Sequence, residues 1–103
     1  MQIVEEELKE KVKQFFDSIG IRYEENETKL KIKGVVESMS IGMIPHVSLR
    51  IDPFVRLVIE KYSEKIRILY ETTLENEHIR DLLINNKQYP QIQYSYGELI
   101  LNF

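Results

Sequence analysis

Two segments of this 103-residue chain alternate apolar and polar residues so regularly that each predicts its own strand pairing. In the first segment, residues 55–60 and 66–71 flank a short turn at Ser63-Glu64. Two apolar pairs are expected across that turn, and two charged pairs on the reverse face: Ile59 with Ile68, Leu57 with Tyr70, Glu60 with Arg67, and Arg56 with Glu71. A slip of one residue would lose both complementary charge pairs and turn the apolar set outward, so the register is well specified.

The second segment is residues 91–103, where two alternating runs meet at Gly97-Glu98. A two-residue loop that begins with glycine predicts a type II′ hairpin turn. The expected apolar pairs are Tyr96 with Leu99, Tyr94 with Leu101, and Ile92 with Phe103. We expect the strand that ends at Phe103 to lie at an open edge of its sheet.

The remaining elements follow from the same kind of patterning. Apolar residues spaced by three and four predict a helix from about Gln2 to Ile19, ended by Gly20. A hairpin is expected to pair Tyr23 with Leu30 and Ile21 with Ile32, and residues 35–45 are either an irregular strand or a loop. The capping box Thr72-Thr73-Leu74-Glu75 and the apolar line of Leu74, Ile79, Leu82 and Leu83 predict a second helix.

This order of elements predicts an α+β fold in a single domain, residues 1–103. The expected architecture is an N-terminal helix, an antiparallel β-meander, a second helix and a C-terminal β-hairpin, with the helices on one face of the sheet.

Composition excludes several classes of function. The chain has no cysteine, which removes disulfides, thiolate nucleophiles and cysteine-bound zinc. Its two histidines belong to no metal-binding motif, so we expect no metal and no cofactor. A formal charge of −3 argues against nucleic acid as a partner. No apolar run approaches the length of a membrane span, and a cytoplasmic location is expected. The Lys and Glu content is compatible with a thermophile, and an A+T-rich genome would give a similar bias. Short chains of no evident family are also common in viruses and plasmids.

One strand face carries the strongest candidate for chemistry. His46, Ser48 and Arg50 alternate with Val47 and Leu49, and Glu60 is expected opposite His46. An arginine, a histidine and a hydroxyl group are able to bind and cleave a phosphodiester without a metal. The competing interpretation of the same three residues is a solvated sheet face.

A candidate contact surface lies in the glycine- and proline-interrupted stretch that precedes this strand. Its apolar residues are Met39, Ile41, Met43 and Ile44. Methionine adapts to many partners, so the segment is either an exposed patch for a protein partner or a loop folded over the core.

The layout of His78-Ile79-Arg80-Asp81-Leu82-Leu83 followed by Tyr96-Gly97-Glu98-Leu99-Ile100-Leu101 resembles part of the fold shared by type III secretion chaperones and YbjN-like proteins. The resemblance implies a homodimeric protein-binding module without catalysis, and it transfers no functional residues.

Together these observations predict a non-enzymatic protein-interaction module, chaperone- or adaptor-like and homodimeric. The alternative is a small metal-independent phosphodiesterase or nucleotide-binding protein that uses His46, Ser48 and Arg50.

Overall fold

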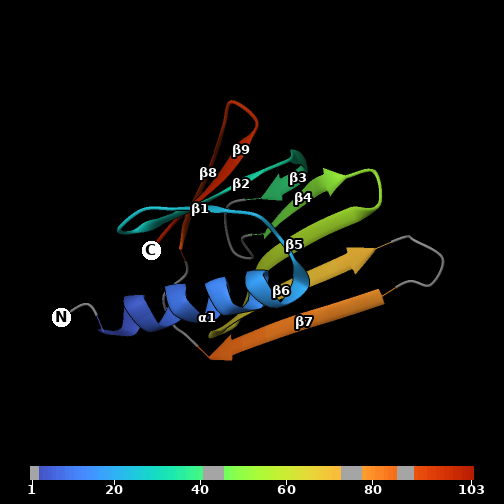
Figure 1. The fold of residues 1–103 in the computed structure, drawn as a ribbon. Coiled ribbons are helices and arrows are strands. Elements are labelled where there is room, and N and C mark those ends of the chain that lie inside the picture. The colour runs from blue at the N-terminus through green and yellow to red at the C-terminus, as the bar shows by residue number, and fades with distance from the viewer. Residues whose placement is uncertain (1–2, 41–45, 73–77, 86–89) are drawn as a thin grey trace. The chain divides into compact units, whose positions relative to one another are not determined.

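The computed structural model describes residues 3–40, 46–72, 78–85 and 90–103. Contacts between α-carbons divide the chain into two compact units, Met1–Lys33 with Gln88–Phe103, and Gly34–Lys87. Figure 1 labels the helix and the strands of both units. The expectation that residues 1–103 form one domain stays a prediction.

The first unit joins one helix to a four-stranded sheet. Helix α1 spans Ile3–Ile19, and the sheet contains β1 (Glu24–Glu25), β2 (Lys29–Lys33), β9 (Glu98–Asn102) and β8 (Gln91–Ser95) in the order β1-β2-β9-β8. The helix forms where the sequence predicts it, because its apolar line is buried: Leu8, Val12, Phe15 and Phe16 are all less than one tenth exposed.

The end of α1 follows a Schellman motif. The Gly20 N–H donates to the Asp17 carbonyl at 3.3 Å, and the Ile21 N–H donates to the Phe16 carbonyl at 3.0 Å. These bonds satisfy carbonyls that the last turn of a helix leaves without partners.

Both hairpins of this unit form, but each pairs two residues away from the predicted register. In the first hairpin Glu24 faces Lys31 and Glu25 faces Leu30. In the second hairpin Tyr94 faces Leu99 and Ile92 faces Leu101, so the turn lies at Tyr96-Gly97 rather than at Gly97-Glu98. A shift of two preserves the alternation of faces, so Ile92 and Tyr94 still face leucines in the second hairpin. In the first hairpin the predicted partners Ile21 and Tyr23 lie outside β1 and do not pair.

The turn type was also wrong, for a reason that the backbone makes clear. Tyr96 has φ 51° and Gly97 has φ 75°, and positive values at both central residues define a type I′ turn. The prediction that the last strand lies at a sheet edge is wrong as well, because β9 lies between β2 and β8.

The second unit is a five-stranded antiparallel sheet with strands in sequence order. Its strands are β3 (Val35–Ser40), β4 (His46–Asp52), β5 (Val55–Tyr62), β6 (Lys65–Thr72) and β7 (His78–Asn85). One face of the sheet carries the buried side chains: Val47, Leu49, Leu57, Ile59, Ile66, Ile68 and Ile84. Figure 1 shows β3 and β7 at the two edges.

The predicted register of the central meander is confirmed. Ile59 faces Ile68, Leu57 faces Tyr70, and the two charged pairs form as expected. His46 faces Glu60, as the sequence also predicted. Positive φ at Ser63 (58°) among the two turn residues fits a type II′ turn.

The predicted second helix is wrong over His78–Asn85, which form strand β7. Residues 73–77, where that helix was to begin, lie outside the described residues. Residues 35–40 form a strand, and residues 41–45 of the same uncertain stretch again lie outside the described ranges. The α+β class is therefore confirmed, with one helix and two sheets in the part of the chain that the structure describes.

Candidate functional site

A β-bulge in the edge strand β3 directs an acidic side chain onto the sheet. The pairing with β4 shifts between Val36, which faces Leu49, and Ser38, which faces Ser48, so Glu37 is the extra residue. A bulge of this kind breaks the strict alternation of faces. Glu37 and Ser38 consequently both contact side chains of β4, on the face opposite the buried residues.

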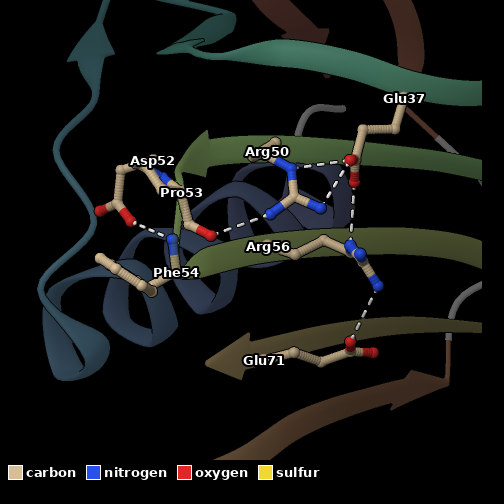
Figure 2. A network of polar contacts seen from close by, with 7 residues as sticks. All are labelled: Glu37, Arg50, Asp52, Pro53, Phe54, Arg56 and Glu71. Atoms are coloured by element: carbon tan, nitrogen blue, oxygen red, sulfur yellow. Dashed lines mark hydrogen bonds and ion pairs between the residues drawn. The ribbon is translucent and has the colours of Figure 1, made fainter. Parts of the chain in front are cut away.

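Glu37 is the centre of a group of four ion-paired residues, Glu37, Arg50, Arg56 and Glu71, which we call the Glu37 cluster (Figure 2). Arg50 Nε donates to Glu37 Oε2 at 2.7 Å, and Arg56 Nε donates to Glu37 Oε1 at 2.9 Å. Arg56 Nη1 also reaches Glu71 Oε2 at 3.4 Å. One carboxylate therefore joins three neighbouring strands.

The register explains why this carboxylate is needed. Arg50 faces Arg56 directly across β4 and β5, and like charges in that position are destabilising. Glu37 gives each guanidinium its own carboxylate oxygen, and the two arginines are balanced by two glutamates. The hydrogen bond from Arg50, and then that from Arg56, hold the pKa of Glu37 below its ordinary value, so the side chain is ionised at neutral pH.

Arg50 has a further structural contact in the β4–β5 turn (Figure 2). Its Nη1 donates to the Pro53 carbonyl at 3.1 Å. In the same turn Asp52 Oδ1 accepts the Phe54 N–H at 2.8 Å, an Asx-type bond that folds the chain back. Arg50 thus links the β4–β5 turn to the edge strand β3 through hydrogen bonds.

The predicted catalytic residues share one strand face but do not converge. Ser48 is only 8% exposed, whereas His46 and Arg50 are half-buried. His46 Nε2 lies 3.4 Å from Ser38 Oγ, and Arg50 bonds Glu37. His46 and Arg50 are four residues apart on β4, about 13 Å along a strand. The three groups therefore do not surround one phosphate-sized space.

Arg67 is a second junction on the same face of the sheet. Its guanidinium lies 3.6 Å from the Glu60 carboxylate on β5 and 3.5 Å from the Asp81 carboxylate on β7. The Glu60–Arg67 pair was predicted from the sequence, and Asp81 is an addition that the strand conformation of β7 makes possible.

In the first unit, two lysines of α1 meet Glu25 of β1. Lys9 Nζ and Lys13 Nζ each lie 2.9 Å from Glu25 Oε2, and Lys9 also donates to the Asn26 carbonyl at 2.7 Å. These bonds, Lys13 first, lower the pKa of Glu25, and Glu25 in turn raises the pKa of Lys13. The contacts fasten the helix to the hairpin and leave no free cationic site at these lysines.

The two edges of the five-stranded sheet differ in their protection. Strand β3 is interrupted by the bulge and carries an inward-directed glutamate, two devices that discourage an added strand. Strand β7 pairs with β6 at every residue from His78 to Asn85, without a register shift. Its outer side meets no strand among the described residues, and Leu83 there is 53% exposed.

The predicted partner surface lies mostly outside the described ranges. Ile41, Met43 and Ile44 belong to residues 41–45, while Met39 is at the end of β3 and is 36% exposed. Val35, at the other end of the same strand, is 64% exposed.

Within the described ranges, no three His, Asp or Glu residues are grouped to hold a metal ion. No helix in this part of the chain is long and apolar enough to cross a membrane.

In comparisons with known proteins, no family model matches the chain, and neither a curated protein nor a solved structure matches it. The resemblance to the type III secretion chaperone and YbjN-like fold accordingly stays a prediction.

Sequence reasoning missed Glu37 because residues 35–45 were not assigned to a strand. Because the bulge breaks the alternation between Val36 and Ser38, assigning Val35–Ser40 to a strand would not by itself have fixed the face of Glu37. The like-charged Arg50–Arg56 pair was the available signal, since such a pair favours an acidic neighbour.

Proposed function

We propose that this chain is a non-enzymatic protein-interaction module, adaptor- or chaperone-like, which forms a homodimer and works in the cytoplasm. It needs no cofactor, and neither nucleic acid nor a membrane is its partner. The thermophilic origin remains an expectation from composition, and the viral or plasmid origin an expectation from the short length of the chain.

The observation that supports this proposal most strongly is that β7 is a regular strand at an open edge of the five-stranded sheet. Its pairing with β6 is regular along the whole strand, and no described strand covers its other side. An edge strand of this kind presents backbone N–H and C=O groups that can pair with a strand of another chain. Exposed Leu83 adds apolar area beside that edge.

A second contact surface belongs to the same proposal. Val35 and Met39 expose apolar side chains on β3, and the segment with Ile41, Met43 and Ile44 continues from Met39 along the sequence. We keep Met39, Ile41, Met43 and Ile44 as the site at which a different protein partner binds.

The alternative function, a metal-independent phosphodiesterase or nucleotide-binding protein, would use His46, Ser48 and Arg50. Arg50 already donates to Glu37 at 2.7 Å and to Pro53 at 3.1 Å, so a phosphate would have to displace a carboxylate from it. Charge-assisted bonds of this kind are strong, and the Glu37 cluster has no excess positive charge to offer an anion. These contacts favour a structural role for Arg50.

Sedimentation equilibrium of the full chain, combined with a thermal-shift screen of nucleotides, tests the proposal. We expect a dimer that dissociates on dilution, and no nucleotide that raises the melting temperature. A strict monomer at every concentration would contradict the proposal. So would phosphodiester turnover that is lost in His46→Ala.

A further inference from the structure

We propose that two copies of this chain pair through their β7 strands, antiparallel, with Leu83 of one copy facing Leu83 of the other. The inference rests on the proposed homodimer and names its interface. The occupant of the open edge is thus a second copy of the same strand, and the dimer joins two five-stranded sheets edge to edge.

Symmetry restricts how two such strands can meet. A twofold axis that makes the strands antiparallel stands perpendicular to the sheet, so residues that face each other lie on the same side of it. A central residue must therefore face its own copy. Within β7 the candidates near the middle are Asp81, Leu82 and Leu83.

Charge repulsion excludes the register in which Asp81 lies on the twofold axis. If Asp81 faced Asp81, two carboxylates would meet directly across the strands, a destabilising arrangement. If Leu82 faced Leu82, Asp81 would instead face Leu83 and lose water around a carboxylate that already pairs with Arg67 at 3.5 Å.

The third register pairs apolar residues with apolar residues and polar residues with polar residues. Leu83 then faces Leu83, Leu82 faces Ile84, and Asp81 faces Asn85 of the second copy. Leu83 is 53% exposed, so two large apolar side chains leave water together. The Asn85 amide offers a donor to the Asp81 carboxylate, and Arg80 lies beyond the paired residues.

The opposite edge explains why the assembly stops at two copies. An open edge at each side would let sheets add without limit. Because β3 contains the bulge and the inward-directed Glu37, pairing through β7 consumes the one regular edge of this sheet among the described strands.

Three single-cysteine variants read the register directly, because the chain has no cysteine of its own. Residues that face each other have β-carbons about 5 Å apart, within reach of a disulfide. We expect mild oxidation to cross-link Leu83→Cys. Asp81→Cys should not cross-link, since two copies of residue 81 would lie about 13 Å apart along the strands. Cross-linking that is strongest at Asp81→Cys or Leu82→Cys would overturn the proposal.

A second pair of variants avoids dependence on oxidation. Leu83→Lys should weaken the dimer by about tenfold or more, as expected for an apolar residue central to an interface. Phe54→Lys, at an apolar residue of the β4–β5 turn that is 50% exposed, is the matched control and should leave the dimer constant unchanged. Circular dichroism checks that each variant folds.

Different results would refute the homodimer and its proposed interface. A wild-type monomer would refute the homodimer itself. A wild-type dimer that tolerates Leu83→Lys, and that does not cross-link at residue 83, would refute only this interface.

Discussion

At the scale of single residues, Glu37 resolves a conflict that the pairing of β4 and β5 creates. Two arginines face each other, and one carboxylate from a neighbouring strand accepts a hydrogen bond from each. The sequence predicted the strands and their partners here but not this carboxylate. A bulge is set by the local geometry of a ladder, and alternation alone does not reveal it.

The Glu37 cluster gives a prediction about stability and pH. Glu37→Gln should lower the free energy of unfolding at neutral pH, because the amide bears no charge to balance Arg50 and Arg56. The pKa of Glu37 is depressed in the folded state, so its contribution is complete above the ordinary glutamate pKa of about 4.3 and is lost as pH falls through the lower folded value. Urea unfolding of both proteins at pH 7 and pH 3 measures this.

The matched control for that experiment is Glu64→Gln, at an exposed turn residue. It should change stability little at either pH. A difference between wild type and Glu37→Gln that is equal at pH 7 and pH 3 would contradict the assigned role of the Glu37 charge.

Tyr96 gives the opposite kind of prediction, a gain in stability. It is fully exposed and has φ 51°, a region that costs most residues roughly 1 kcal/mol and that asparagine tolerates. Tyr96→Asn creates the Asn-Gly pair that type I′ turns prefer, and should raise the free energy of unfolding by about 0.5–1 kcal/mol. Thermal unfolding monitored by circular dichroism checks this, with Tyr94→Asn as the control that should not stabilise.

At the scale of elements, β7 shows where sequence reasoning failed. The Thr72–Glu75 capping box and a few leucines at helical spacing predicted a helix, but His78–Asn85 pair with β6 as a strand. Ile68 and Ile66 of β6 face Leu82 and Ile84, so pairing extends the buried face of the sheet. That gain in packing outweighs a weak local preference, and a short apolar run does not by itself distinguish the two structures.

The hairpins show a milder version of the same limit. Alternation correctly predicted the shared face of Ile92, Tyr94 and their leucine partners in the second hairpin. In the first hairpin the predicted apolar residues Ile21 and Tyr23 lie outside the paired strand. The position of the turn depends on which two residues accept positive φ, and Tyr96 is an unusual choice that the pattern did not indicate. In the central meander, the complementary charge pairs restricted the possible registers of β5 and β6, and the predicted register was correct.

The start of β3 gives a prediction at this scale. A β-carbon on Gly34 would lie 2.8 Å from the Arg50 carbonyl oxygen and 2.8 Å from Leu49 Cγ, closer than packed atoms permit. Gly34→Ala should therefore cost about 1–3 kcal/mol of stability, the range for overpacked sites. Chemical denaturation measures it, and Val35→Ala, 64% exposed, should stay within about 0.5 kcal/mol of wild type.

At the scale of the whole molecule, the two edges of the five-stranded sheet differ in structure, and we assign them different roles. The bulged edge β3 is closed by its own glutamate, and the regular edge β7 is open to a second copy. The sequence alone predicted an interaction module, but it placed β7 in a helix and so did not indicate this edge. Binding surfaces made of backbone groups leave little trace in side-chain patterns.

Hydrogen exchange at single-residue resolution, on dilute and on concentrated samples of the wild-type chain, shows directly whether a second copy covers the edge of β7. Amides of Asp81–Asn85 that do not bond to β6 should exchange about tenfold or more slowly in the concentrated sample, while the rates of β3 amides stay the same. Exchange in β7 that does not change with concentration, or protection that appears in β3 instead, would contradict pairing of two copies through β7.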